Sequence, residues 1–203
     1  MSNLILAYTD ADKTEIGLLR ENESDNHATP FLYLGSCFDD PEPQTTHIIN
    51  LTKEVQTSKE YIHLILPIND SPETILDFGT ALTFINKCKE EKGCCLVHCM
   101  MGISRSASIV LAFLIDHLQM PLDQAYSYVR SRRKVILPNA GFMNQLECFE
   151  NQRLGRRSKM IEYGVDWLMK ILRDATRTTV LKVIQQTGGN REEALERLVD
   201  LQQ

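Results

Sequence analysis

The sequence predicts an α/β fold with a central sheet flanked by helices, followed by a small C-terminal segment of three helices. Before residue 155, short runs rich in β-branched residues are followed by longer stretches with helical spacing of apolar residues. One apolar run leads into a glycine-containing loop and then directly into a helical pattern. This order of strand, loop and helix is typical of the carboxyl edge of the sheet in α/β proteins.

Four segments have the composition of strands, and a polar leader precedes them. Residues 1–28 are polar and irregular in pattern, which predicts a flexible or loosely attached segment. The polar stretch 52–60 is expected to be a loop or a short helix. The expected strands are apolar runs bounded by polar or turn residues, at 31–35, 47–51, 61–67 and 94–98.

The first predicted helix spans residues 72–92. Ser71 is a suitable N-cap, Pro72 fits the first helical position, and Gly93 ends the pattern. Its expected apolar face consists of Ile75, Leu76, Phe78, Leu82, Ile85 and Cys88. Further helices are predicted from residue 105 onward, over 122–132 and over 139–153.

The loop 99–105 carries the strongest chemical signal in the chain. Cys99 begins the loop and Arg105 ends it, where the next helix starts. The N–H groups and dipole of a helix N-terminus favour an anion and stabilise a thiolate. An arginine can hold two phosphate oxygens at once. Together these groups predict cleavage of a phosphate ester, and the alternative is a buried cysteine and a surface arginine with this spacing by chance.

Three motifs resemble those of the cysteine-based protein phosphatases. The sequence His98-Cys99-x5-Arg105-Ser106 resembles the signature loop of that family. Residues 33–36 (YLGS) and 137–146 (LPNAGFMNQL) resemble segments of its atypical dual-specificity branch. The resemblance implies a dual-specificity phosphatase-like catalytic domain over residues 29–154.

The same resemblance implies roles for individual residues. Cys99 is expected to attack phosphorus and form a phosphocysteine intermediate, while Arg105 and the loop N–H groups stabilise the phosphate oxygens. Asp70, on a loop upstream, is our candidate for the acid that protonates the leaving oxygen. Its alternative role is helix capping, and Asp77 is the weaker alternative acid. Ser106 is expected to hydrogen-bond the departing sulfur and can also cap the helix.

Other residues are expected to support the loop or to contact the substrate. The resemblance implies that Asn139 braces the loop, and His98 is expected to orient it through hydrogen bonds. Arg133 falls near a second phosphate site of the family, although a solvated charge at a helix C-terminus is equally compatible with its position. The predicted substrate-binding residues are Met100, Met101, Gly102, Ile103, Ser104, Arg105 and Arg133.

The loop interior favours one class of substrate. It carries no charge between Met100 and Ser104, which suits protein phosphoresidues better than polyanionic inositol phosphates. We therefore expect a dual-specificity protein phosphatase acting on phosphotyrosine and phosphoserine or phosphothreonine, without a metal or cofactor. The alternatives are a phosphoresidue-binding adaptor with negligible catalysis, and a phosphatase of phosphoinositides or RNA 5′-phosphates.

Residues 155–203 form the predicted C-terminal segment. Helical patterns cover 161–174, 178–187 and 191–201, and Asn190 is a suitable N-cap for the last. Residues 187–198 resemble the end of ubiquitin-associated (UBA-like) domains, which implies binding of ubiquitin or another protein; alternatively, the helices only pack on the catalytic domain. The apolar residues expected to form the bundle are Val165, Leu168, Ile171, Leu172, Val180, Val183, Ile184, Leu195 and Leu198.

Composition and cysteine usage narrow the class of protein. The net charge of −5 gives no basic footprint for nucleic acid or for an anionic membrane surface. No apolar run approaches the roughly 20 residues of a membrane span, and the N-terminus lacks a signal-peptide pattern.

The six cysteines have no zinc-site spacing, so reduced thiols are expected. Cys94 or Cys95 is expected either to form a disulfide with Cys99 on oxidation or only to pack in its strand. We expect a cytoplasmic protein, with the nucleus as a second location.

Overall fold

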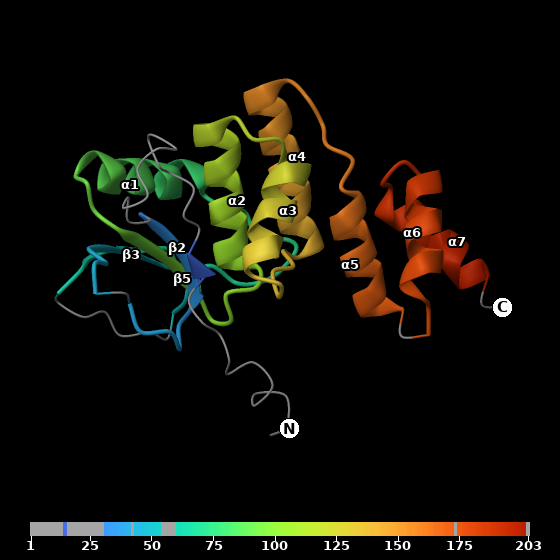
Figure 1. The fold of residues 1–203 in the computed structure, drawn as a ribbon, viewed down its shortest axis with the longest axis horizontal. Coiled ribbons are helices and arrows are strands. Elements are labelled where there is room, and N and C mark those ends of the chain that lie inside the picture. Colours follow the sequence, from blue (N-terminus) through green and yellow to red (C-terminus); the bar gives the residue numbers. More distant parts are fainter. Residues whose placement is uncertain (1–13, 16–30, 42, 54–59, 173, 202–203) are drawn as a thin grey trace.

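Five strands form one mixed sheet in the order β1-β2-β5-β3-β4 (Figure 1). Strand β1 pairs antiparallel with β2, and all other neighbours are parallel. The central position of β5 places its carboxyl end beside those of β2 and β3. The strands are β1 (Thr14–Glu15), β2 (Leu32–Ser36), β3 (His47–Asn50), β4 (Ile62–Ile65) and β5 (Cys95–Cys99).

The structure of the chain, a computed structural model, describes residues 14–15, 31–41, 43–53, 60–172 and 174–201. The predicted leader therefore lies outside the described residues, apart from Thr14–Glu15. The same holds for residues 54–59 of the segment expected to be a loop or short helix. The four strands expected from the sequence are confirmed, each shifted at its ends by two residues or fewer.

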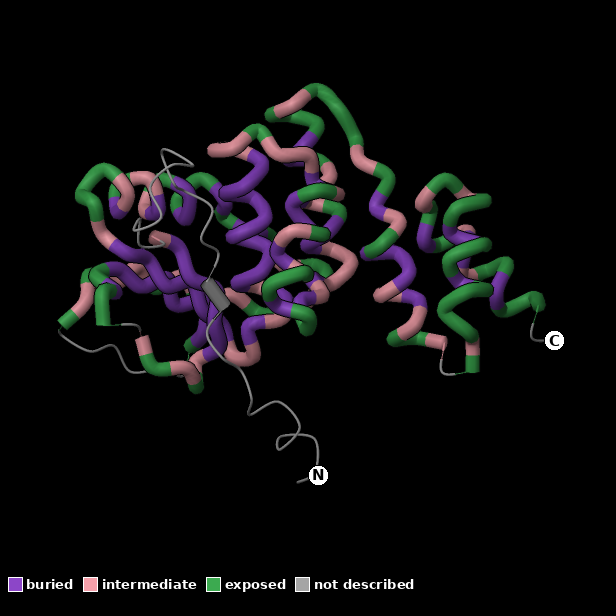
Figure 2. Tube along the Cα trace, viewed as in Figure 1, coloured by how far each residue is buried: buried purple, intermediate pink, exposed green. Residues whose placement is uncertain are grey.

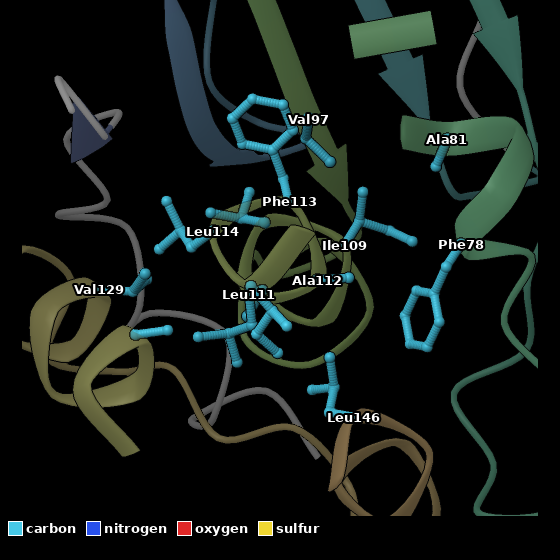
Figure 3. Packing of buried hydrophobic residues seen from close by; sticks show 14 of the residues in the cluster. Phe78, Ala81, Val97, Ile109, Leu111, Ala112, Phe113, Leu114, Val129 and Leu146 are labelled. Carbon is cyan, nitrogen blue, oxygen red and sulfur yellow. The ribbon is translucent and has the colours of Figure 1, made fainter. Parts of the chain in front are cut away.

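Four helices within residues 78–154 lie on one side of the sheet. They are α1 (Phe78–Glu90), α2 (Arg105–Leu118), α3 (Leu122–Arg132) and α4 (Ala140–Leu154). Figure 3 shows α2 at the centre, with Val97 of β5, Phe78 of α1, Val129 of α3 and Leu146 of α4 around it. Helix α2 is buried on all sides over residues 106–115, which explains its nearly continuous run of apolar and small residues (Figure 2).

Alternate strand residues point to opposite faces of the sheet. Leu34, Ile49 and Val97 join the large core with the helices. On the opposite face, Tyr33, Ile48, Cys94 and Leu96 form a small cluster of their own. The helices therefore bury one face of the sheet far more heavily than the other, and the core holds β5 and α2 in place on either side of the loop 99–105.

The first helix begins later than predicted. Asp77, not Ser71, is its N-cap, and the Asp77 carboxylate accepts a hydrogen bond from Thr80 N–H at 3.0 Å. Two backbone groups of the segment 71–77 instead bond to Gln145 of α4, whose side chain accepts from Leu76 N–H and donates to the Thr74 carbonyl. These tertiary hydrogen bonds replace the first helical turns. As a result, Ile75, predicted on the apolar face, is 84% exposed.

The C-terminal helices form a second core. They are α5 (Ile161–Ile171), α6 (Arg177–Gln186) and α7 (Arg191–Asp200), and Asn190 caps α7 as predicted. The buried members of this core are Val165, Leu168, Val180, Val183, Ile184, Ala194 and Leu198. Ile171 was expected there but is exposed, because α5 ends at this residue. None of the helices in the described ranges combines the length and apolar character of a membrane span.

Candidate active site

The loop 99–105 joins the end of β5 to the start of α2. Cys99 is the last residue of β5 and is 1% exposed, and Arg105 is the first residue of α2. Gly102 has φ +65°, and a Cβ there would lie 2.7 Å from the Gly35 carbonyl oxygen. Only glycine fits both the left-handed backbone and this close approach to β2. The turn of the loop is therefore built into the sequence.

Two hydrogen-bonding groups face the Cys99 sulfur. The Gly102 N–H donates to Sγ at 3.3 Å, and Ser106 Oγ lies 3.2 Å from the same atom. Ser106 Oγ also lies 3.4 Å from the Gly35 carbonyl. Because the hydroxyl has a single proton, it can donate to the sulfur when the sulfur carries negative charge. The predicted contact between Ser106 and the sulfur is thus present.

Arg105 is held at the loop mouth by two backbone carbonyls. Its Nη1 donates to Ile68 O at 3.1 Å and to Leu51 O at 3.3 Å. Its Nε is buried and has no hydrogen-bond partner in the described part of the chain. Anchoring through Nη1 leaves Nε as a donor on a guanidinium whose position is already fixed, which suits bidentate binding of an oxyanion.

Asp70 lies at the same mouth. One carboxylate oxygen, Oδ1, accepts from Ser104 Oγ at 2.7 Å and from Asn139 Nδ2 at 2.8 Å. The other, Oδ2, is 3.8 Å from Arg105 Nε. The side chain is 36% exposed. Asp70 therefore caps none of the described helices, and its carboxylate lies beside Arg105 at the mouth of the loop.

Asn139 connects the loop to the next segment. Besides bonding Asp70, it caps α4 by accepting from Phe142 N–H, and its own N–H donates to Ser104 Oγ at 3.1 Å. The predicted bracing contact is present, although it runs through the side chains of Ser104 and Asp70. Ser104, expected among the substrate-binding residues, is buried and is occupied by these two bonds.

The structure contradicts the substrate contact predicted for Arg133. This side chain is 5% exposed and points behind the loop, where Nε donates to Gly102 O at 2.9 Å and Nη2 to Met101 O at 3.1 Å. Burial lowers the pKa of its guanidinium. Arg133 thus fixes two loop carbonyls from the inside, and a buried arginine cannot reach a second phosphate in solvent.

His98 is buried next to the nucleophile. Desolvation lowers the pKa of its imidazole, and a hydrogen bond with the backbone of Cys99 only partly opposes this. That hydrogen bond links the ring to the loop, as expected for an orienting residue. Its Nδ1 has no hydrogen-bond partner among the described residues. Burial thus disfavours the protonated form of this imidazole.

The loop rim is apolar. Met100, Met101 and Ile103 are partly exposed, whereas Gly102 is buried. Met100 is fixed by Cys37, whose N–H donates to Met100 O at 3.3 Å and whose thiol lies 3.4 Å from the Met100 sulfur. Cys37 had no role in the sequence analysis. Cys37 directly follows β2, and β2 pairs with β5, which leads into the loop. Only this pairing could have indicated that Cys37 lies beside Met100.

The alternative of a disulfide between Cys99 and its neighbours is wrong. Cys95 and Cys99 are the two ends of β5, and strand residues rise about 3.3 Å each, so their Cα atoms lie roughly 13 Å apart. A disulfide needs Cα atoms within about 7 Å. Cys94 precedes Cys95 and lies farther away. Cys95 is buried within β5 and Cys94 is buried directly before it, so both pack in the fold as the second alternative expected.

Sequence reasoning missed a contact that places the acid loop. A Cβ on Gly141 of α4 would lie 1.9 Å from the Pro72 carbonyl oxygen, so the backbone after Asp70 touches α4 directly. Within the described ranges, no group of three or more His, Cys, Asp or Glu side chains is placed to hold a metal ion.

Comparison with known proteins agrees with this geometry. Residues 32–152 match the dual specificity phosphatase catalytic domain. The chain is 34% identical over 161 residues to dual specificity protein phosphatase 1-A of Xenopus laevis, covering 74% of this chain and 43% of that protein. It is 38% identical over 108 residues to human protein phosphatase Slingshot homolog 1, covering 51% of this chain and 10% of that protein. The chain thus spans less than half of either relative.

A solved structure shows the same fold. The human tyrosine phosphatase-like serine/threonine/tyrosine-interacting protein superposes with a TM-score of 0.57 and 31% identity, covering 62% of this chain and 95% of that one. The match to the family extends over more than half of the chain and includes β2, β5, α2 and the loop 99–105. The chain therefore belongs to the dual specificity phosphatase family.

Proposed function

We propose that this chain is a dual-specificity protein phosphatase that hydrolyses phosphotyrosine and phosphoserine or phosphothreonine through a phosphocysteine intermediate. The observation that carries the proposal is the arrangement of three groups around one loop. The Cys99 thiol lies at its floor, Arg105 is anchored at its mouth, and Asp70 lies beside Arg105. A phosphoresidue-binding adaptor has no need for the nucleophile and the acid together.

In the first step, the Cys99 thiolate attacks phosphorus, and the bond from phosphorus to the substrate oxygen breaks. Arg105 and the loop N–H groups stabilise the phosphate oxygens in the transition state. Asp70 donates its proton to the leaving oxygen. Because Asp70 Oδ1 accepts two hydrogen bonds, Oδ2 is the oxygen that carries this proton.

In the second step, water attacks the phosphorus and the bond to sulfur breaks. Asp70, now ionised, takes a proton from the water, and phosphate leaves. The sulfur departs as a thiolate, and Ser106 Oγ, 3.2 Å away, donates a hydrogen bond to it. The Gly102 N–H, at 3.3 Å, donates to the same atom.

The rim of the loop supports a phosphoprotein substrate. Met100, Met101 and Ile103 present apolar, partly exposed side chains. Arg133, which was expected near a second phosphate site, is buried, so its guanidinium is not available to a second phosphate group. We therefore favour phosphorylated side chains of proteins over phosphoinositides and RNA 5′-phosphates.

Hydrolysis assays with two kinds of substrate test this proposal. We expect Cys99→Ser to abolish hydrolysis of both p-nitrophenyl phosphate and phosphotyrosine or phosphothreonine peptides, because the nucleophile is lost. Asp70→Ala should lower kcat for the phosphothreonine peptide by about 100-fold or more, the usual range for a general acid. The loss for p-nitrophenyl phosphate should be much smaller, since its leaving group needs little protonation.

Asp77→Ala is the matched control. Asp77 was the alternative acid, and in the structure its carboxylate caps α1. This variant should lose about 0.5–2 kcal/mol of stability and keep its kcat. Activity that survives Cys99→Ser would refute the mechanism. A wild-type protein inactive on every phosphoester would favour the adaptor.

We also propose that residues 155–203 form a UBA-like module that binds ubiquitin. The support is a separate apolar core shared by α5, α6 and α7, with the apolar side chains of Leu181 and Val199 exposed. Titration of ubiquitin into the isotope-labelled full chain should shift amide signals of this segment. Leu181→Asp should weaken binding, and Ile75→Asp, an exposed apolar site on the catalytic domain, should not. Unchanged spectra at millimolar ubiquitin would contradict the proposal.

A further inference from the structure

Residues 133–139, here called the bracing segment, line one side of the active-site loop. Leu137 N–H donates to Ile103 O at 2.9 Å. Arg133 and Asn139 add the contacts to Met101, Gly102, Ser104 and Asp70 described above. Backbone and side-chain bonds along the whole segment thus set the position of the loop and of the acid.

The opposite side of the bracing segment contacts α5. Tyr163 of α5 is fully buried, and its hydroxyl donates to Pro138 O at 3.0 Å. Its ring packs edge-on against Tyr126 of α3, with 5.5 Å between centroids. Pro138 directly precedes Asn139, whose side chain bonds Asp70. The contact with α5 and the contact with the acid therefore lie on two consecutive residues.

Asp166 makes a second set of contacts from α5. Its carboxylate binds the guanidinium of Arg130 through both oxygens and also accepts from Arg177 at 3.0 Å. Burial acts to raise the pKa of Asp166, but the hydrogen bonds from Arg130 and Arg177 outweigh it, and the pKa lies below its usual value. Arg130 in turn donates to Lys134 O, in the bracing segment, at 2.6 Å.

Tyr126 completes the link. Its buried hydroxyl lies 3.1 Å from Asp166 Oδ2 and 3.4 Å from Ile136 O. The Asp166 carboxylate therefore orients two side chains of α3, Arg130 and Tyr126, that both reach carbonyls of the bracing segment. Figure 1 shows α5 beside α3, on the side away from the sheet.

We propose that α5 is part of the support of the active site, with Tyr163 and Asp166 acting as positioning residues. The proposal rests on the proposed phosphatase function and adds a role for a helix that lies beyond the matched catalytic domain. Neither residue contacts the substrate. Both act through the bracing segment, so their removal should alter the geometry of the loop in a protein that remains folded.

The physical basis is the sensitivity of an oxyanion site to position. Loop donors stabilise the transition state only when they are fixed in place beforehand. A displacement of about 1 Å can lower a rate by roughly 100-fold, even when the altered residue is remote from the chemistry. Loss of one of several bracing bonds should cause a smaller displacement, because the bonds of Arg133, Leu137 and Asn139 remain.

Kinetics of full-chain variants test the proposal. We expect Tyr163→Phe to lower kcat for p-nitrophenyl phosphate by about three- to tenfold, and Asp166→Asn by about tenfold. KM should change less than kcat, since the effect falls on the transition state. Orthovanadate binds such a loop as an analogue of the five-coordinate transition state, so its inhibition constant should rise by a similar factor. All measurements are made below the unfolding transition of each variant, as followed by circular dichroism.

Two variants supply matched controls. Tyr61→Phe removes the hydroxyl of a residue that directly precedes β4 and packs on the face of the sheet opposite to the helices. Asp200→Asn neutralises an exposed carboxylate at the end of α7. Both should keep the kcat and the vanadate constant of the wild type. A purely structural role of Tyr163 and Asp166 would lower the unfolding temperature without moving either quantity in the folded protein.

The outcomes separate this proposal from the proposed function. Folded Tyr163→Phe and Asp166→Asn variants with wild-type kcat and vanadate constant would overturn it. If the wild type hydrolyses no phosphoester, the phosphatase function fails, and vanadate binding measured by calorimetry decides on the positioning role: weaker binding by the variants supports it and equal binding refutes it. If Asp166→Asn does not fold, Tyr163→Phe, which removes one oxygen atom, decides alone.

Discussion

Ser104 joins three parts of the active site through one hydroxyl group. It donates to Asp70 Oδ1 and accepts from the N–H of Asn139. Ser104 is also the N-cap residue of α2, yet its side chain makes no capping bond. The hydroxyl that would ordinarily stabilise the helix instead fixes the acid and the bracing segment. At this position, helix stability is given up for geometry at the site.

His98 makes stability depend on pH. Burial lowers the pKa of its imidazole in the folded protein below the usual value of 6.5. As the pH falls through about 6.5, the unfolded chain binds a proton that the folded protein does not, so the free energy of unfolding decreases. We expect the free energy of unfolding of His98→Gln to change less than that of the wild type between about pH 7.5 and pH 5.5.

Urea unfolding at a series of pH values measures this difference. The two proteins are compared at the same pH, so the contributions of the other histidines to the difference in free energy of unfolding cancel. Parallel curves for wild type and His98→Gln would show that the buried imidazole makes no contribution.

The roles of some site residues could be predicted from the sequence, and the roles of others could not. Cys99 and Arg105 could be assigned because a strand, a loop and a helix contiguous in sequence place them together, whereas the role of Ser106 came from family resemblance. Asp70 and Asn139 depended on family resemblance, and the structure places both at the loop mouth. Arg133 could not be assigned: nothing in a run of basic residues tells which one turns inward, since this depends on the loop carbonyls that it meets.

Among the secondary-structure elements, α4 connects most parts of the fold through one buried carboxylate. Glu150 accepts from Leu122 N–H, which starts α3, and from both N–H and hydroxyl of Ser158, in the linker to α5. Asp123 Oδ1 of α3 lies 2.9 Å from the same hydroxyl oxygen, so the two carboxylates share its single proton. The path of the linker is therefore set by α4 and α3 together.

Replacing Glu150 tests this arrangement. Glu150→Gln keeps the size of the side chain but replaces one carboxylate oxygen, an acceptor, with an NH2 group. That NH2 group then faces a hydrogen-bond donor. We expect the free energy of unfolding to fall by about 1–3 kcal/mol, because a buried donor loses its partner. Urea denaturation measures it. Glu196→Gln, at an exposed position of α7, is the control and should stay within about 0.5 kcal/mol of wild type. An equally small effect at Glu150 would show that the linker is held by other contacts.

Most elements could be predicted because each has an apolar pattern of its own. Helix α3 was predicted with its exact bounds, and the helices α4 to α7 within a few residues. Helix α1 was extended too far because residues 72–77 fit a helix locally, with a proline and suitable capping residues. Their hydrogen bonds to Gln145, 69 to 71 residues away in sequence, are invisible to local patterns.

For the whole molecule, the sequence indicated two units but not the contact between them. Trp167 packs against both apolar cores, and Met160 and Tyr163 belong to the core of the catalytic part. Arg191, the first residue of α7, is buried against Tyr163 and pairs with Glu147 of α4 at 2.6 Å. In sequence, Asp166, Arg130 and Arg191 resemble ordinary surface charges, and only their pairing across helices shows that they hold the two units together.

The position of Met160 and Tyr163 sets where this protein can be divided. The family match ends at residue 152, whereas the apolar core of the catalytic part continues to Tyr163. A fragment cut at the family boundary would lose two buried side chains, each worth roughly 1.5–3 kcal/mol of burial. That is a large share of the roughly 5–15 kcal/mol by which a typical domain is stable. A fragment that keeps every buried side chain of this core therefore extends into α5.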